Sequence, residues 1–151
     1  MKEVKEMYTP DDLDWKIIDI LREEDQSNNA VARQLGISEG TVRQRLKRLK
    51  EADILTVRAQ INPEVLNDQQ LAMVGITIQE SCYLKERVQE IAALPSVLSA
   101  SITSGRYDIL AEVLTDSNHG LVEFLTDQLS GVKSIGSTET FVILKSYKKY
   151  V

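Results

Sequence analysis

The chain has 151 residues, 42% of them hydrophobic, which is enough for folded cores in one ordinary domain or in two small ones. A formal net charge of -5 argues against a protein that coats nucleic acid indiscriminately. The single cysteine, Cys82, and the single histidine, His119, argue against an internal disulfide, a Cys/His metal cluster and hence a metal cofactor.

The opening stretch MKEVKEMYTPDD carries charges where a signal peptide has its apolar core. The apolar runs in the rest of the chain are too short to span a membrane. We therefore expect a soluble, cytoplasmic protein.

Three short helices are predicted in the N-terminal third of the chain. The first begins at Asp11 and covers DDLDWKIIDILREED, where apolar residues recur at helical spacing and acidic residues crowd the first turn. Ser27 can cap a second helix, which Gly36 ends. Ser38 can then cap a third helix over EGTVRQRLKRLKEA. The apolar stripe of this third helix consists of Val42, Leu46 and Leu49.

The Gly-Ile-Ser turn between the second and third helices is typical of a helix-turn-helix, whose third helix enters the major groove of DNA. Ala32 is small enough to let the helices approach, and Gly36 can adopt the unusual dihedral angles of the turn. Residues 43–58 carry six basic and two acidic side chains, and such a local excess attracts phosphates. The alternative is a charged helix that is merely solvated.

Eight residues are candidate DNA contacts. The first turns of the outer face point into the groove, so their side chains are placed for base edges: Thr41, Arg43, Gln44 and Lys47. The candidate phosphate contacts are Arg45, Arg48 and Lys50. Ser38 can cap the helix and bind a phosphate at the same time.

The C-terminal half switches repeatedly between strand and helix periods. ILTVRAQI, after Asp53, predicts a strand that Asn62-Pro63 stops. From Ala72 onward the pattern predicts the strand MVGITI, the helix LKERVQEIAAL, the strands VLSASIT and YDILAEVL, the helix LVEFLTDQL and the strand TETFVIL. This βαββαβ order is that of a ferredoxin-like sandwich, with both helices on one face of an antiparallel sheet.

The predicted fold class is therefore α+β, in two domains. Residues 1–58 form a winged-helix-like helix-turn-helix domain, 59–71 a linker, and 72–151 a ligand-sensing and oligomerisation domain. Because the helices protect only one face of the sheet, we expect the other face to be covered in a homodimer.

The segment SNNAVARQLGISEGTVRQRLKRLKEADIL, preceded by Asp11, Asp14 and the Ile17-Ile18 pair, resembles the DNA-binding domain of the Lrp/AsnC (feast/famine) transcription regulators. The second half is similar to the ligand-sensing domain of that family, in the hairpin TSGRYD (103–108), in Gly131-Val132 and in TETFVI (138–143). The resemblance extends from about Asp11 to Lys148.

The resemblance implies a sequence-specific regulator that binds double-stranded DNA as a dimer, often assembled into tetramers or octamers, with an amino acid bound between dimers. The residues matching the effector hairpin of the family are Gly105, Tyr107 and Asp108. Thr138 and Thr140 lie on the last strand, and we expect the hydroxyl of one of them to reach the same pocket, although β-branched residues are also normal in strands without a ligand. Gly105 supplies the positive φ of a tight turn, and Asp108 offers a carboxylate to an ammonium group. The plainer alternative is a turn-stabilising aspartate and a packing tyrosine.

Three departures from the family pattern stand out. The loop 24–27 lacks one residue and the usual glycine-basic pair. Asp53 stands where glycine usually follows the third helix, and the stretch 132–138 is slightly long.

Two other functions fit the same outline. One is an enzyme that handles a tetrapyrrole, as the similar sirohaem decarboxylases do with histidines and arginines of the α/β half. Here that half holds only His119, Arg87 and Arg106, and the sequence lacks the phosphate loops and nucleophile elbows of common enzymes, so we expect no enzymatic activity. The other is a DNA-wrapping protein without an effector.

Overall fold

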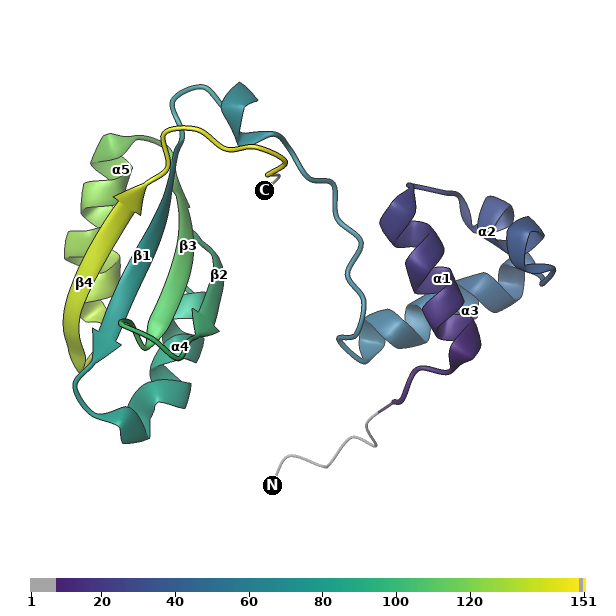
Figure 1. Cartoon of the computed structure of the whole chain (residues 1–151), viewed down its shortest axis with the longest axis horizontal. Helices are drawn as coiled ribbons and strands as arrows, with labels where there is room; N and C mark the ends of the chain where they lie inside the picture. Colours follow the sequence, from purple (N-terminus) through teal and green to yellow (C-terminus); the bar gives the residue numbers. More distant parts are fainter. Residues whose placement is uncertain (1–7, 150) are drawn as a thin grey trace. The chain divides into compact units, whose positions relative to one another are not determined.

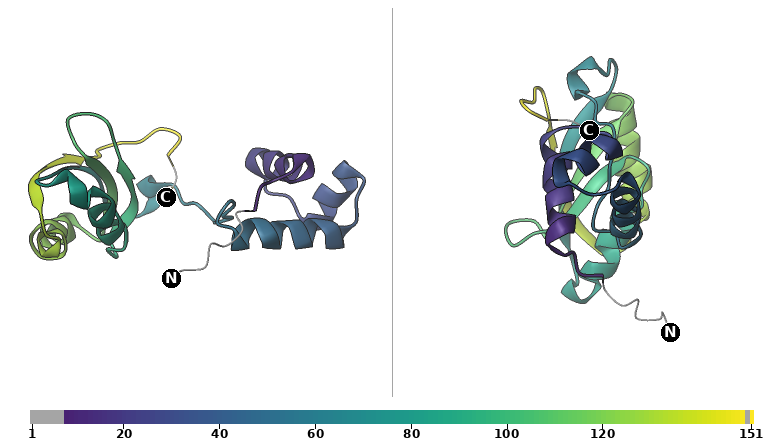
Figure 2. Two further views of the ribbon diagram at one scale, coloured as in Figure 1. Left: turned by 90° about the horizontal axis from the view of Figure 1, so that it is seen from below. Right: turned by 90° about the vertical axis from the view of Figure 1, so that its right-hand side faces the viewer.

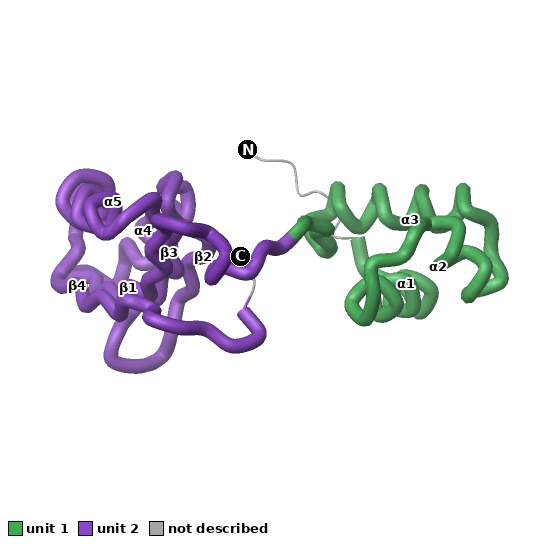
Figure 3. The backbone as a smooth tube through the Cα atoms, turned by 90° about the horizontal axis from the view of Figure 1, so that it is seen from above, with its two compact units in different colours: residues 1–59 green, residues 60–151 purple. Residues whose placement is uncertain are grey.

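The computed structural model describes residues 8–149 and 151, and it divides into two compact units, residues 1–59 and 60–151 (Figure 3). Each unit has its own hydrophobic core. The first seven residues, whose charges entered the argument against a signal peptide, lie outside the described part. No helix among the described residues is long and apolar enough to cross a membrane.

The N-terminal unit confirms the three predicted helices within its described residues: α1 (Asp12–Glu23), α2 (Asn28–Leu35) and α3 (Glu39–Glu51) (Figure 1). The predicted caps are also confirmed. Ser27 Oγ accepts a hydrogen bond from the backbone N–H of Ala30 at 3.2 Å, and Ser38 Oγ accepts one from Thr41 at 3.1 Å. Gly36 ends α2 with a φ of 67°, the left-handed conformation that glycine adopts without strain.

The core of this unit lies where the three helices meet. Ile17 of α1, Val31 of α2 and Val42 of α3 are all fully buried. Ala32 is 4% exposed and lies in the same cluster, which fits the close approach of helices that its small side chain was predicted to allow. Burial of branched aliphatic side chains of this size stabilises a domain by about 1.5 to 3 kcal/mol each.

Helix α3 ends in a hydrogen-bonding pattern that normally calls for glycine. The backbone N–H of Ile54 donates to the carbonyl of Leu49 at 3.0 Å, and that of Asp53 donates to Lys50 at 3.2 Å. These two bonds form a Schellman motif, whose turning residue must be left-handed. Asp53 accordingly has a φ of 55°, so the departure from the family pattern changes the residue but keeps the turn.

The predicted strand over residues 54–61 is wrong. The backbone of residues 55–62 is irregular, and Val57 and Ile61 are about half exposed. Of this stretch, Ile61 pairs with another segment, through two hydrogen bonds with Val151. Alternating β-branched residues favour a strand only where a neighbouring strand supplies a ladder, and within the described part of the chain no strand lies beside residues 55–60.

The C-terminal unit has the predicted βαββαβ order. Its strands are β1 (Gln70–Ile78), β2 (Val97–Ile102), β3 (Ile109–Thr115) and β4 (Ile135–Val142). The helix α4 (Leu84–Ala92) links β1 to β2, and α5 (Asn118–Glu123) continues as a π-helical turn (Phe124–Gln128) and a 3-10 turn (Leu129–Gly131) toward β4. Short 3-10 turns precede β1 (Pro63–Val65) and α4 (Ser81–Tyr83).

All neighbouring strands are antiparallel, in the order β2-β3-β1-β4. Both helices cover the same face of this sheet (Figures 1 and 2). The core on that face contains Val74 and Ile76 of β1, Ala111 of β3, and Ile91 and Phe124 from the helical layer. The alternate residues of each strand form the other face, which we call the open face.

Asp53 gives the first testable prediction. Replacing Asp53 with glycine should raise the free energy of unfolding of the N-terminal unit by about 0.5 to 1 kcal/mol, because an L-residue is strained at positive φ. Chemical denaturation would measure the change. Asp25→Gly, in the loop between α1 and α2, is the control and should not stabilise. A destabilised Asp53→Gly variant would mean that the aspartate side chain contributes more than its strain costs.

Candidate DNA interface and effector hairpin

The outer face of α3 presents most of the predicted DNA contacts to solvent. The exposed members are Arg43, Gln44, Lys47, Arg48 and Lys50. Their exposure follows from the burial of Val42, Leu46 and Leu49 on the opposite side of the same helix. The sequence-based assignment of an outer, basic face is therefore matched by the positions of these five side chains.

The charges on this face differ in how far they are neutralised within the chain. Arg43 pairs with Glu39 at 2.5 Å and Lys47 with Glu51 at 3.8 Å, both one helical turn apart and exposed. Such surface pairs contribute about 0.5 kcal/mol and exchange readily for a phosphate. Arg48 and Lys50 form no ion pair within the described residues.

The start of α3 combines two hydroxyl groups. Ser38 Oγ and Thr41 Oγ1 are 2.8 Å apart, and Ser38 Oγ also accepts the backbone N–H of Thr41. Thr41 is half-buried, so its hydroxyl is held at the helix end rather than extended outward. This arrangement places two hydroxyls beside the positive end of the helix dipole, a position that favours a phosphate oxygen.

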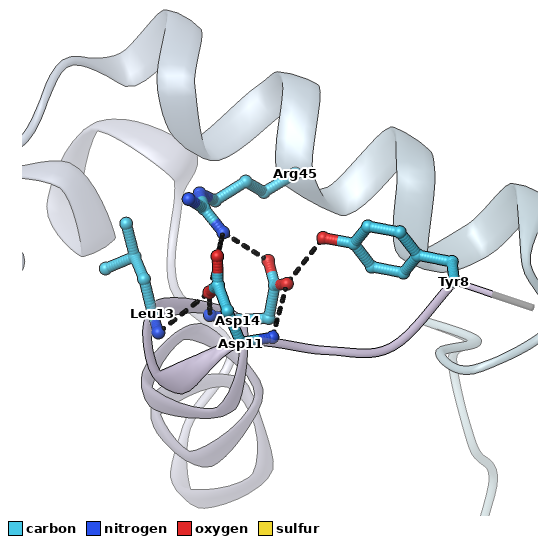
Figure 4. Close-up of polar contacts among 5 residues, drawn as sticks. All are labelled: Tyr8, Asp11, Leu13, Asp14 and Arg45. Atoms are coloured by element: carbon cyan, nitrogen blue, oxygen red, sulfur yellow. Dashed lines mark hydrogen bonds and ion pairs between the residues drawn. The ribbon is translucent and has the colours of Figure 1, made fainter.

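Arg45 is bound inside the N-terminal unit (Figure 4). Its Nη1 donates to both carboxylate oxygens of Asp11 at 2.7 Å and to Oδ1 of Asp14 at 2.9 Å. Asp11 and Asp14 also form the capping box of α1, in which each side chain accepts the backbone N–H of the other residue. Tyr8 donates its hydroxyl to Oδ2 of Asp14 at 2.5 Å. We call these four residues the Arg45 cluster.

The charges of the Arg45 cluster stabilise one another. The hydrogen bond from Arg45, then that from the Asp14 backbone, lowers the pKa of Asp11 below its ordinary value of 3.8. Burial alone would raise the pKa of the Asp14 carboxyl, but the hydrogen bonds from Tyr8, Arg45 and the Asp11 backbone outweigh it, so this pKa is lowered too. The same contacts, first with Asp11 and then with Asp14, raise the pKa of Arg45.

These contacts change the role assigned to Arg45. The sequence pattern placed it among the phosphate contacts, but its side chain is only 23% exposed and its charge is met by two carboxylates. We therefore assign Arg45 to positioning α3 against the start of α1. The pattern showed Asp11 and Asp14 as helix-starting acids, and their spacing of three residues was the signal for the capping box.

The hairpin 103–108 is closed by its own polar groups. Oδ2 of Asp108 accepts the backbone N–H of Ile78 at 2.7 Å, and the N–H of Asp108 donates to Ile76 at 3.0 Å. Thr103 Oγ1 donates to the carbonyl of Tyr107 at 2.5 Å. One oxygen of Asp108 thus fixes the hairpin to the end of β1, as the plainer alternative for a turn aspartate predicted. The prediction that Gly105 supplies a positive φ is wrong: no residue of 103–108 has one, because a six-residue connection can reverse the chain without a left-handed residue.

Tyr107 lies over the open face of the sheet. Its ring covers Gly75, where an added Cβ would come within 2.6 Å of ring carbon Cγ. The phenol donates to Glu139, the cross-strand neighbour of Gly75, and the ring meets Phe141 edge-on with centroids 6.3 Å apart. Arg106 lies 3.3 Å from the Glu139 carboxylate and 5.4 Å from the Tyr107 ring.

Thr138 and Thr140 do not join this group. The register pairs them with Ile76 and Val74, whose side chains are in the helix-covered core. They therefore lie on the opposite face of β4 from Tyr107, and the prediction that one of their hydroxyls shares a site with it is not matched within this chain. Glu139, which lies between them on the Tyr107 side, was missed, although strand alternation already predicts that it faces away from Thr138 and Thr140.

Both halves of the chain match known protein families. Residues 10–56 match the winged helix-turn-helix DNA-binding model, and residues 71–151 match the Lrp/AsnC ligand binding domain model. The regulator Ptr1 of Methanocaldococcus jannaschii, an HTH-type transcriptional regulator, is 31% identical over 91% of this chain and 94% of its own length.

Two solved structures share the fold of the whole chain. Escherichia coli AsnC is 27% identical, with a TM-score of 0.68 over 92% of this chain and 95% of that one. A transcriptional regulator of Neisseria meningitidis, solved in complex with L-Met, is 24% identical, with a TM-score of 0.71 over 94% of each chain.

The Arg45 cluster predicts a stability effect. Arg45→Ala should lower the free energy of unfolding of the N-terminal unit by about 1 to 3 kcal/mol, because it leaves the fully buried Asp14 carboxylate with fewer partners. Denaturant unfolding followed by circular dichroism would measure it. Arg43→Ala is the matched control, since Arg43 forms an exposed pair and should cost less than about 0.5 kcal/mol. Equal effects of the two variants would contradict the prediction.

The Arg45 cluster also makes the free energy of unfolding of the N-terminal unit depend on pH. The folded-state pKa values of Asp11 and Asp14 are lowered, so their contribution is present above the ordinary value of 3.8 and is lost as the pH falls below it. The wild-type unit should therefore lose stability below about pH 4 more steeply than Asp11→Asn does. Parallel slopes for the two proteins, in unfolding curves measured from pH 6 to pH 2.5, would contradict this.

Proposed function

The chain belongs to the Lrp/AsnC family of transcription regulators, and we propose that it reads a specific DNA site through α3, acts as a dimer and responds to an amino acid. The observation that carries the DNA-reading part is the exposed face of α3. Its residues 43, 44, 47, 48 and 50 lie on a helix that the Arg45 cluster holds at a defined position. A helix fixed in this way can direct side chains to particular base edges.

The proposed contacts divide into two kinds. Gln44, with Arg43 and Lys47, faces outward on the first turns of α3 and is placed for base edges. Arg48 and Lys50, without ion-pair partners among the described residues, are placed for phosphates, together with Ser38 and Thr41 at the helix start. Arg45 is left out of both groups.

The proposed dimer forms through the open face of the C-terminal sheet. This face contains apolar side chains that the helices of the same chain do not cover, among them Phe141, which is 44% exposed. A second copy would cover them with the same surface, as in an isologous interface. A dimer carries two recognition helices, so its site should be roughly palindromic, with half-sites about one helical turn or a multiple apart.

The proposed effector is an amino acid held at the hairpin 103–108. Support comes from the ligand-binding domain model that residues 71–151 match and from the L-Met complex of the Neisseria regulator. The hairpin offers backbone amides near Gly105, and Asp108 uses one oxygen on Ile78 while the other lies outside that bond. Amides suit a carboxylate and the aspartate suits an ammonium group.

Mutations on α3 test the DNA-reading proposal. Gln44→Ala should weaken binding to the preferred site by about 1 to 3 kcal/mol and leave binding to random DNA unchanged. Lys50→Ala should weaken all sequences alike and reduce the salt dependence by about one unit for the lost phosphate contact. Fluorescence anisotropy on a site selected from random DNA, over a range of salt concentrations, provides both quantities. If both variants bind operator and random DNA as the wild type does, α3 is not the reader.

Calorimetry with the twenty amino acids tests the effector. Asp108→Asn keeps an oxygen for the Ile78 N–H but removes the negative charge, so it should abolish the binding heat and preserve the fold. Asp127→Asn, on an exposed stretch after α5, is the control. Binding of the amino acid should change the free energy of DNA binding by about 1 to 3 kcal/mol. DNA should change the affinity for the amino acid by the same factor. No heat with any amino acid, or equal heat with Asp108→Asn, would remove the hairpin from the mechanism.

A further inference from the structure

A carboxylate lies in the middle of the open face. Glu112 belongs to the inner strand β3 and is paired with Met73 of β1 and Ser99 of β2. Its flanking open-face residues on β3 are Leu110 and Leu114, both half-buried, and Phe141 lies beyond Met73 on β4. The Glu112 side chain is only 14% exposed. A second sheet placed on this face would therefore exclude the remaining water from the Glu112 carboxylate.

The counter-charge comes from a segment near the end of the chain. Lys149 Nζ lies 2.7 Å from Oε1 and 2.9 Å from Oε2 of Glu112. We call residues 143–149, which carry this lysine from the end of β4 back to the sheet, the strap. The edge view of the sheet shows the strap on the side opposite α4 and α5 (Figure 2). The open face is thus partly covered by its own chain.

The strap is held at both ends by backbone hydrogen bonds. At its start, the N–H of Ile143 donates to the carbonyl of Leu71 at 2.9 Å. Beyond its end, Val151 and Ile61 exchange two hydrogen bonds, of 2.8 and 3.0 Å. Fixing the Lys149 side chain costs conformational entropy, but the backbone that carries it adds little to this cost because it is already anchored on both sides.

We propose that Lys149 neutralises Glu112 within each protomer, so that the strap forms part of the dimer interface and dimerisation depends on it. The inference rests on the proposed dimer through the open face. Burying an unpaired carboxylate is far more costly than burying a paired one, because the pair keeps its hydrogen bonds and its attraction as water leaves. In the monomer, Lys149 is part of what covers Glu112, so removing the lysine side chain readmits water to the carboxylate, and the loss acts mainly on association.

The occupant of the face is a second copy of this chain. A symmetric dimer would bring two such pairs into one interface, and each pair is already neutral before the surfaces meet. A partner carrying its own positive charge at this position would instead meet Lys149 and be repelled. The neutralised carboxylate therefore favours a partner surface without net charge, and the open face of an identical protomer carries its charges as pairs, Glu112 with Lys149 and Glu139 with Arg106.

Sedimentation equilibrium on four forms of the full chain tests the proposal. Lys149→Ala should raise the dimer dissociation constant at least about 100-fold, because it leaves Glu112 unpaired in the interface. The double variant Glu112→Gln with Lys149→Ala removes both charges, so its dimer dissociation constant should return to within about tenfold of the wild-type value. Lys145→Ala, which removes an exposed positive charge from the same strap, is the matched control and should leave it unchanged.

Charge reversal separates pairing within a protomer from pairing between protomers. Glu112→Lys and Lys149→Glu should each impair the dimer, and the double reversal in one chain should recover it. Mixing the two single variants should not recover it; recovery on mixing would mean that the pair forms across the interface and would overturn the proposal. A Lys149→Ala dimer as tight as the wild type would also overturn it. A wild-type chain that stays a folded monomer at micromolar concentration would instead refute the proposed dimer itself.

Discussion

The guanidinium group of Arg45 joins α3 to the first turn of α1. It meets Asp11 and Asp14, which are already committed to capping α1, so one cluster ends one helix and positions another. Asp14 is fully buried, and its charge is tolerated because three hydrogen-bond donors surround it. The outer face of α3 is available to DNA because this internal contact, together with the apolar stripe, determines which side of the helix faces outward.

A comparable arrangement operates in the C-terminal unit. There the helices take one face of the sheet, and the other face is finished by side chains from distant parts of the sequence: Tyr107 from the hairpin and Lys149 from the strap. In both units a carboxylate with little exposure, Asp14 or Glu112, forms an ion pair with a residue more than thirty positions away in the chain. In each unit these internal contacts determine which surface stays exposed.

Periodicity was sufficient for the helices, their caps, the βαββαβ order and the outer face of α3, because these depend on neighbours within a few residues. It failed for residues 54–61, where a strand pattern has no neighbouring strand, since pairing partners are not written into local sequence. It did not show the ion pairs of Arg45, because helical spacing shows which residues share a face but not which distant carboxylate lies near one of them. It also did not show that Thr138 and Thr140 lie on the opposite face of β4 from Tyr107, which the buried Val74 and Ile76 opposite them decide once the register is known.

Gly75 has a consequence for how the two binding events of such a regulator could communicate. Because Gly75 lacks a side chain, the Tyr107 ring lies directly on the backbone of β1, and through this ring the hairpin 103–108, where we propose that the effector binds, contacts the open face. A molecule that displaced this ring would change the thickness of the sheet at one corner of the proposed interface, and no rearrangement of the core would be required. The coupling between the hairpin and the interface would then pass through the Tyr107 ring alone. It would depend on Gly75, because any larger residue there would collide with the ring.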